Sequence, residues 1–141
     1  MIHLSVKRAG RLIVFSVFFI VLSCGAAGQQ AEDRLKESVV QFNEGIRWGR
    51  MQEVIPRVHP DNVQHFLKMH EHFGNETQVS DYELISYEYN QEKKSATINV
   101  RITWYKQSEM ALHTTILIQS WEHIESDWIL MTETFHSGEA F

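Results

Sequence analysis

The chain has only one cysteine, Cys24, among its 141 residues. Without a second cysteine no disulfide can form within the chain, so the packed core alone must stabilise the fold. The sequence also lacks internal repeats and low-complexity segments, which argues against a repeat array and against a disordered chain. We find no catalytic motif that stands above chance matches.

Basic residues are scarce as well. The chain has 13 Lys and Arg against 18 Asp and Glu, a net charge of −5 at pH 7. Three of the basic residues and none of the acidic ones lie in residues 1–23, so residues 24–141 carry a net charge of −8. This acidity argues against binding to nucleic acid. It also opposes binding to anionic lipid head groups, so membrane attachment would require acyl chains.

The one long apolar run is short for a membrane span, and its flanks are informative. Residues 12–22 are apolar except for Ser16, and Ser23 and Cys24 follow them. Three basic residues precede the run: Lys7, Arg8 and Arg11. A positive segment, an apolar segment and a small residue before cysteine are typical of a bacterial lipoprotein signal. We therefore predict a signal peptide over residues 1–23 and attachment of diacylglycerol, with palmitate-type chains, to Cys24.

Three alternatives to the lipoprotein signal stay open. A transmembrane anchor needs about 20 apolar residues, more than this run supplies. An ordinary secretory signal cleaved near Ala26 or Ala27 would discard Cys24. In a secreted eukaryotic protein, Asn75 would be a glycosylation acceptor, because Thr77 follows it at the required spacing. Resemblance to Gram-negative lipoproteins implies sorting to the outer membrane, facing the periplasm, since glycine rather than aspartate follows Cys24.

Residues 24–31 form the predicted connection between the lipid and the domain. They are small and polar without an apolar period, so we expect a flexible tether. Seven extended residues reach at most about 25 Å. Residues 32–141 are then one domain with one core.

The first part of this domain has a helical pattern. Apolar residues recur at spacings of four, three and four at Leu35, Val39, Phe42 and Ile46, which predicts an amphipathic helix. A second short helix is expected over residues 50–58, kinked by its internal proline. A third is expected to begin after Asp61 as N-cap and to end near Gly74.

The period changes to two after residue 77. Apolar and polar residues alternate over residues 96–105, which predicts a strand with one buried face. Further strands are expected over residues 82–89, 113–122 and 128–135. Helices followed by hairpin-linked strands predict an α+β domain with N-terminal helices packed on a curved four-stranded antiparallel sheet.

Short motifs within these segments resemble a known family. The run FNEGIRWG at positions 42–49, with HPD at positions 59–61, resembles the helical start of nuclear transport factor 2-like domains. QSW at positions 119–121 and DWIL at positions 127–130 resemble their closing hairpin. The resemblance covers about residues 32–135 and implies a cone-shaped fold. The whole chain also resembles proteobacterial lipoproteins with this domain. The superfamily contains ketosteroid isomerase, scytalone dehydratase, transport adaptors and ligand-binding proteins, so the fold does not select a function.

Three residues are candidates for the lining of a cone pocket: His70, Tyr87 and Trp104. His70 lies on the apolar face of the predicted third helix, where an imidazole at a pocket mouth could do acid–base work. As a core residue it would instead hydrogen-bond to backbone or to a tyrosine such as Tyr87. Trp104 belongs to a set of strand aromatics that suits either an apolar ligand or a packed core.

A metal site is the weaker possibility. His65, Met69 and His72 recur at spacings of four and three on the other face of that helix. Two imidazoles and a thioether would suit copper, and a solvated helix face explains them equally well. No second ligand cluster is evident in the sequence.

These observations favour a lipid-anchored, non-catalytic envelope domain that binds a small apolar ligand or an envelope protein and needs no cofactor. No residue matches a catalytic pattern of the superfamily, and the 96–105 strand has no carboxylate on its apolar face. The alternative is an isomerase, dehydratase or hydrolase that uses the cone pocket. A periplasmic metal-handling lipoprotein is the third hypothesis.

Overall fold

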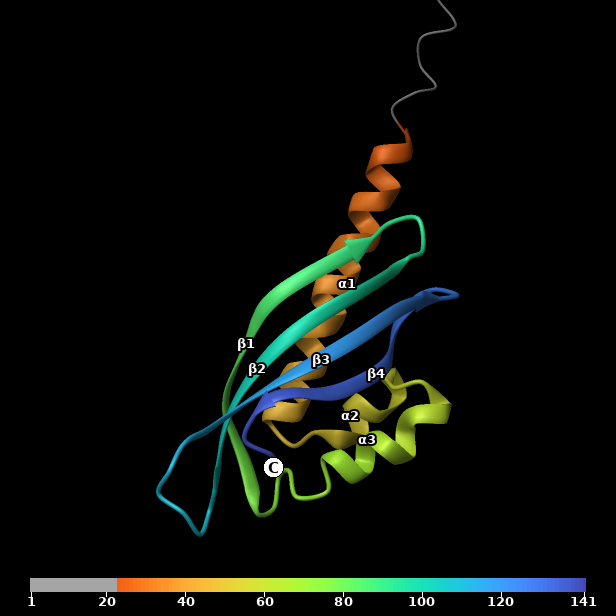
Figure 1. Ribbon diagram of the computed structural model, residues 1–141. Coiled ribbons are helices and arrows are strands. Elements are labelled where there is room, and N and C mark those ends of the chain that lie inside the picture. Colours follow the sequence, from red (N-terminus) through yellow and green to blue (C-terminus); the bar gives the residue numbers. More distant parts are fainter. Residues whose placement is uncertain (1–22) are drawn as a thin grey trace, which may run out of the picture.

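The computed structural model describes residues 23–141, so the predicted signal peptide lies outside the described residues except for Ser23. Helices come first: α1 (Ser23–Arg47), α2 (Met51–Val54), the 3-10 turns η1 (Ile55–Arg57) and η2 (Pro60–Asn62), and α3 (Val63–Met69). Four strands follow: β1 (Thr77–Asn90), β2 (Ser95–Lys106), β3 (His113–Ile124) and β4 (Asp127–Gly138) (Figure 1). Among the described helices, none combines the length and apolar character that a membrane crossing requires.

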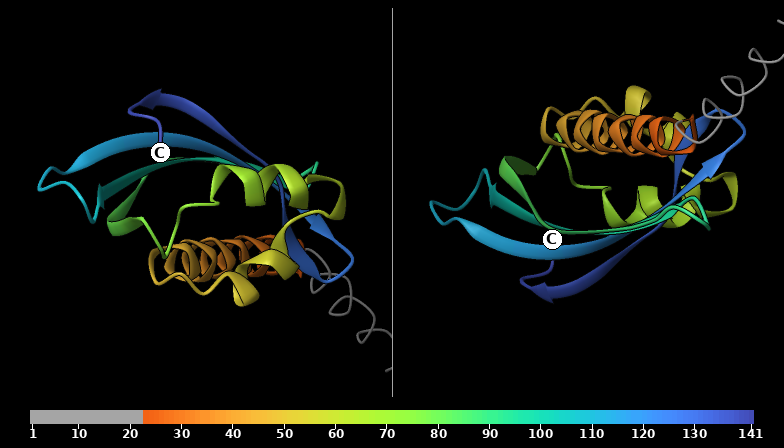
Figure 2. Two further views of the ribbon diagram at one scale, coloured as in Figure 1. Left: turned by 90° about the horizontal axis from the view of Figure 1, so that it is seen from below. Right: turned by 90° about the horizontal axis from the view of Figure 1, so that it is seen from above.

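The strands form one antiparallel sheet in the order β1-β2-β3-β4. Each strand pairs with the next one along the chain, as hairpin connections require. The helices lie together on one face of the sheet, which bends around them (Figure 2). The α+β class and the four-stranded antiparallel sheet preceded by helices are thereby confirmed.

The core lies between α1 and the inner face of the sheet. The predicted apolar stripe of α1 is buried, with Leu35, Val39 and Phe42 fully inaccessible to solvent. On β2 the predicted inward residues are at most 1 % exposed: Ile98, Val100, Ile102 and Trp104. Their polar neighbours on β2 face the other side of the sheet. The alternating pattern therefore assigned the sheet face correctly.

The structure differs from expectation over residues 24–31, which are helical instead of forming an irregular tether. Alanine and glutamine favour helix, and no proline separates this segment from the helix that follows. Contacts hold this part of the helix in place. Trp128 Nε1–H donates to the carbonyl oxygen of Ala31 at 3.0 Å, and Lys36 pairs with Glu32 one turn away at 2.8 Å. The domain's first helix thus starts before Glu32.

The third helix is shorter than predicted. Pro60 begins the 3-10 turn η2, so α3 starts only at Val63 and Asp61 is not its N-cap. His70 is the C-cap, and its backbone angles of −104° and 17° leave the helical region. The chain from there to Gly74 forms turns. The proline start and the early C-cap together limit α3 to two turns.

Candidate functional site

A β-bulge on β4 brings an acidic side chain into the core. Leu130 and Thr132 pair with consecutive residues of β3, so Met131 is an extra residue in β4. Strict alternation from Leu130 would turn Thr132 inward and Glu133 outward. The extra residue reverses that order, since bulges re-aim the side chains that follow them. Glu133 is consequently only 4 % exposed.

The Glu133 carboxylate belongs to a buried polar network. Oε2 accepts a hydrogen bond from Gln119 Nε2 at 2.7 Å, and Oε1 lies 2.5 Å from His70 Nε2. The Gln119 amide also donates to Asn43 Oδ1 at 3.0 Å and accepts from Trp121 Nε1 at 3.3 Å. All five side chains are buried. The network connects α1, the end of α3 and the two last strands.

The chemical nature of these side chains determines which of them donate hydrogen bonds in the network and which accept them. An ionised carboxylate only accepts, so His70 Nε2–H donates to Glu133 when that carboxylate is charged. Two donors on one buried carboxylate offset the loss of its hydration. His70 Nδ1 is also buried, and among the described residues it has no hydrogen-bond partner. One imidazole nitrogen therefore retains unused hydrogen-bonding capacity.

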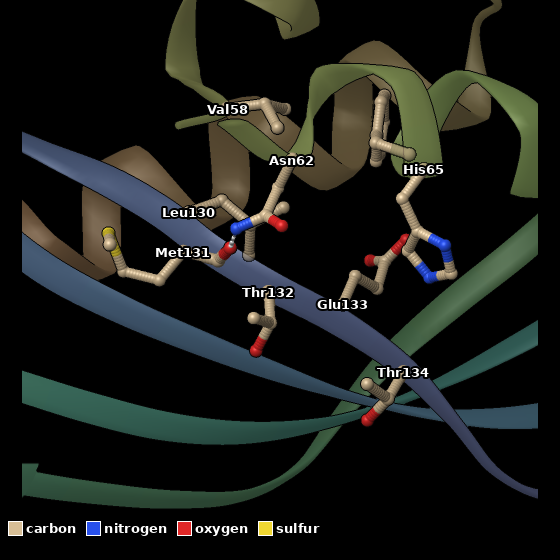
Figure 3. A pocket seen from close by; sticks show the side chains of 9 residues that line it. Val58, Asn62, His65, Leu130, Met131, Thr132, Glu133 and Thr134 are labelled. Atoms are coloured by element: carbon tan, nitrogen blue, oxygen red, sulfur yellow. Dashed lines mark hydrogen bonds between the residues drawn. The ribbon is translucent and has the colours of Figure 1, made fainter. Parts of the chain in front are cut away.

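A cavity of about 140 Å³ lies between β4 and the segment from Val58 to Phe66. Figure 3 shows Glu133 and His65 beside it, with Leu130 and Val58 further along the same lining. Nine residues line the cavity: Val58, Asn62, His65, Phe66, Leu130, Met131, Thr132, Glu133 and Thr134. The side-chain amide of Asn62 donates to the carbonyl oxygen of Met131. The bulge that turns Glu133 inward thus also shapes the cavity wall.

Two larger hollows lie along α1, of about 320 and 380 Å³. Both are open and lined mainly by polar side chains, and both include Gln41 and Arg57. Arg57 donates to Gln41 at 2.5 Å between them. Neither hollow is lined by one of the buried polar residues of the Glu133 network. The smaller cavity is the better candidate for a binding site because it joins apolar walls to a buried acidic side chain.

The three predicted pocket residues do not form one site. His70 and Trp104 share a neighbour, Phe141, whose ring centroid lies 6.1 Å from that of His70 and 5.5 Å from that of Trp104. Tyr87 pairs with Ile98 on β2, six residues from Trp104. Six strand residues span about 20 Å. The partner of His70 is Glu133 rather than Tyr87.

Tyr87 lies under the first half of α1. Lys36 Nζ is 5.5 Å from its ring centroid. Burial, with a smaller contribution from the nearby Glu32 carboxylate, raises the pKa of Tyr87. Its hydroxyl is buried without a hydrogen-bond partner among the described residues. The phenol therefore stays protonated at neutral pH and cannot act there as a base.

The residues of the metal hypothesis separate in the structure. His65 lines the cavity, whereas Met69 packs against the core. His72 lies beyond the end of α3, 3.4 Å from Glu71 and 3.6 Å from Glu76. Helical spacing therefore does not extend to His72. Within residues 23–141 no group of three or more His, Cys, Asp or Glu side chains is placed to hold a metal ion.

A second histidine cluster lies where β2 passes to β3. His113 Nδ1 is 2.5 Å from Glu139 and its Nε2 is 3.1 Å from Glu109. Its ring stacks on Trp104 with centroids 4.5 Å apart. Hydrogen bonding to Glu139, followed by that to Glu109, raises the pKa of His113 despite partial desolvation. This cluster links the β2–β3 loop to the segment that follows β4.

Sequence reasoning missed Asn43, Gln119 and Glu133. Gln119 alternates with inward Leu117 and Trp121, and Asn43 lies four residues after buried Val39, so both gave a readable signal of polar residues on apolar faces. Glu133 gave none, because the bulge shifts its phase. No family model matches this chain, and no curated protein sequence matches it.

Proposed function

We propose that this domain binds a small, largely apolar ligand of one-ring size that carries a hydrogen-bond donor. The cavity between α3 and β4 is the site, and Glu133 is the polar anchor. The observation that carries this proposal is a buried carboxylate in the wall of a mainly apolar cavity. Pockets with apolar walls and few fixed polar groups are the usual form of small-molecule sites.

Size and preorganisation support the ligand class. The cavity of about 140 Å³ is close to the roughly 150 Å³ that accommodates benzene in an engineered apolar cavity. Glu133 is fixed by Gln119 and His70 on its two oxygens, so it need not reorganise to receive a ligand. A hydroxyl or amine on the ligand would reach a remaining lone pair of the carboxylate. Lipids with long chains exceed this volume.

The test compares cyclopentanol with cyclopentane, which lacks the donor. We expect cyclopentanol to bind more tightly and to shift the NMR signals of Val58 and Leu130. Glu133→Gln should weaken cyclopentanol binding about 10-fold or more, because hydrogen bonds to charged groups are worth about 1.5–3 kcal/mol. Glu122→Gln, an exposed carboxylate on β3, is the matched control. Equal affinity for both compounds, or shifts elsewhere in the chain, would refute the proposal.

A second function, acid–base catalysis, is favoured by one observation. The His70–Glu133 pair combines an imidazole and a carboxylate, and Glu133 borders the cavity. We favour binding because both carboxylate oxygens are already engaged by internal donors.

Screening small carbonyl and hydroxyl compounds for turnover separates the two functions. A turnover that Glu133→Gln abolishes, with the fold retained, would replace the binding function by an isomerase, dehydratase or hydrolase. His70→Phe is less suitable, because it would leave Glu133 without one of its two donors.

For location, we propose a lipid-anchored domain in the bacterial cell envelope, at the outer membrane and facing the periplasm. The support is the signal pattern that ends at Cys24. We further propose that the domain is a nuclear transport factor 2-like cone. Its support is the order of elements, with helices before a four-stranded antiparallel sheet, and the short motifs quoted above. The fold proposal does not select between binding and catalysis.

A further inference from the structure

Four aromatic rings and one imidazole meet at the end of the core away from Tyr87. Phe73 lies 4.5 Å from Phe141 and 4.6 Å from His70, as measured between ring centroids. Phe66 is 4.4 Å from His70, and Trp104 is 5.5 Å from Phe141. Phe141 therefore fills a slot whose other walls are His70, Phe73 and Trp104, with Phe66 packed behind His70.

The occupant of this slot is less firmly held than its walls. The three wall residues are at most 8 % exposed, whereas Phe141 is only half-buried. Phe141 also lies outside every helix and strand. Among the described residues, the hydrogen bonds that hold this segment end at Glu139. Its N–H donates to the carbonyl oxygen of Thr114 at 3.0 Å, and its carboxylate meets His113.

A glycine positions the segment. Gly138 has a φ of +98°, and a Cβ there would collide with the backbone of Thr114. Only glycine fits this turn, which ends β4 and directs residues 139–141 across the end of the sheet. Within residues 23–141, only ring contacts hold Phe141 in the slot beyond Glu139. The ring can therefore leave without breaking a hydrogen bond to this part of the chain.

One wall of the slot, His70, also has an unused polar atom. His70 is 3 % exposed, its Nε2 is engaged by Glu133, and its Nδ1 has no partner among the described residues. Phenylalanine at position 141 cannot satisfy that nitrogen. When Nε2 carries the proton, Nδ1 is an acceptor. A ring of similar size with a hydroxyl or N–H group would supply both the aromatic contacts and the missing donor.

We propose that Phe141 is a displaceable side chain in a binding site for a planar aromatic ligand with a hydrogen-bond donor, formed by His70, Phe73 and Trp104. Phenol is the simplest such compound. The site shares none of these residues with the lining of the cavity between α3 and β4, so it does not depend on the function proposed above. Ligand binding requires the ring to leave the slot. The apparent association constant is therefore the intrinsic constant multiplied by the fraction of molecules in which the ring has left.

The experiment titrates the protein with phenol and with toluene, which has the ring but no donor. In the wild-type protein, phenol should shift the NMR signals of Phe73, Trp104 and the amides of residues 139–141. Phe141→Ala removes the competing ring and should raise the affinity for phenol about 10-fold or more, the effect expected where at most a tenth of the molecules are open. Phe135→Ala removes another phenylalanine, 50 % exposed on β4, and should leave the affinity unchanged.

Three outcomes would overturn the proposal. Equal phenol affinity in Phe141→Ala and wild type would show that the ring does not compete. Phe141→Ala that binds toluene as tightly as phenol would show an engineered apolar cavity rather than a ligand site. Wild-type signals that do not respond at Phe73, Trp104 and residues 139–141 would show that the ring is not displaced. The wild-type titration keeps the proposal testable if Phe141→Ala fails to fold.

Discussion

Gln119 is the residue on which the buried polar network depends. One amide donates to Glu133 and to Asn43 and accepts from Trp121, and no part of the side chain is exposed to solvent. These partners come from α1, β3 and β4. A side chain of similar volume without polar atoms would leave each of them without that bond. An unsatisfied buried polar group costs more than the net gain of a made hydrogen bond.

We therefore expect Gln119→Met to destabilise the fold by about 2–4 kcal/mol, since it orphans a buried carboxylate oxygen and an amide. The free energy of unfolding in urea measures this loss. Ser120→Ala, one residue away on the other face of β3, is the control and should change stability by less than about 0.5 kcal/mol. A Gln119→Met variant as stable as this control would show that the network contributes little to folding.

His113 makes stability depend on pH in a defined direction. Its pKa in the folded protein is raised because its ring bonds to Glu139 and Glu109. A raised pKa means that protonation favours the folded state. The stabilisation is complete below the unfolded histidine pKa of about 6.5, provided the carboxylates are ionised, and is lost as pH rises through the folded value.

The variant His113→Gln should accordingly differ most from wild type at about pH 5.5 and least at about pH 8.5. The melting temperatures of the two proteins at both pH values measure this effect. Other titrating groups are common to both chains and largely cancel in the difference. A gap that widens with rising pH would mean that the imidazole, not the imidazolium, is favoured in the folded protein.

At the scale of elements, regular periods were predictable and local irregularities were not. The stripe on α1 and the alternation on β2 identified both sides of the core, because each element is regular over its whole length. On β4 the extra residue Met131 shifts the alternation, so strict alternation along the sequence would place Glu133 on the outer face. A bulge forms through strand pairing and leaves no local pattern. The candidate site could not be found for that reason.

Glycine in α1 has a packing role that the helical pattern did not reveal. A Cβ on Gly45 would lie 2.5 Å from Cγ2 of Val54 on α2, a side chain that is 1 % exposed. We predict that Gly45→Ala destabilises the fold by about 1–3 kcal/mol through overpacking, although alanine is the better helix former. The midpoint of urea unfolding measures the change. The close approach of the two helices requires glycine at this position.

Gly28→Ala is the matched control in the same helix. The three atoms nearest to a Cβ there all belong to the end of the Gln91 side chain, which is exposed and can move. We expect this variant to be neutral or more stable by about 0.5–1 kcal/mol, the helix preference of alanine over glycine. If both variants shift stability equally, helix propensity rather than the contact with Val54 sets the effect at Gly45.

For the whole molecule, the helical start of α1 shortens the distance that a lipid at Cys24 would leave between the domain and a membrane. A flexible tether would let the domain lie up to about 25 Å from a lipidated residue. The helix instead spans residues 24–31, and eight helical residues rise only about 12 Å. Figure 1 shows these first turns of α1 extending beyond the sheet. A lipid at Cys24 would therefore hold the domain close to the bilayer at a restricted orientation.

The proposed lipid anchor leads to a prediction about where the protein is located. Two or three acyl chains bind stably, since each buried CH₂ contributes about 0.8 kcal/mol and one chain alone is marginal. Cys24→Ala should therefore move the protein from the membrane fraction to the soluble fraction or leave its signal uncleaved. Ser23→Ala keeps a small residue before the cysteine and should remain membrane-bound. Mass spectrometry of the mature N-terminus checks the modification directly. An unmodified Cys24, or a mature chain that begins after it, would contradict the anchor and favour ordinary secretion.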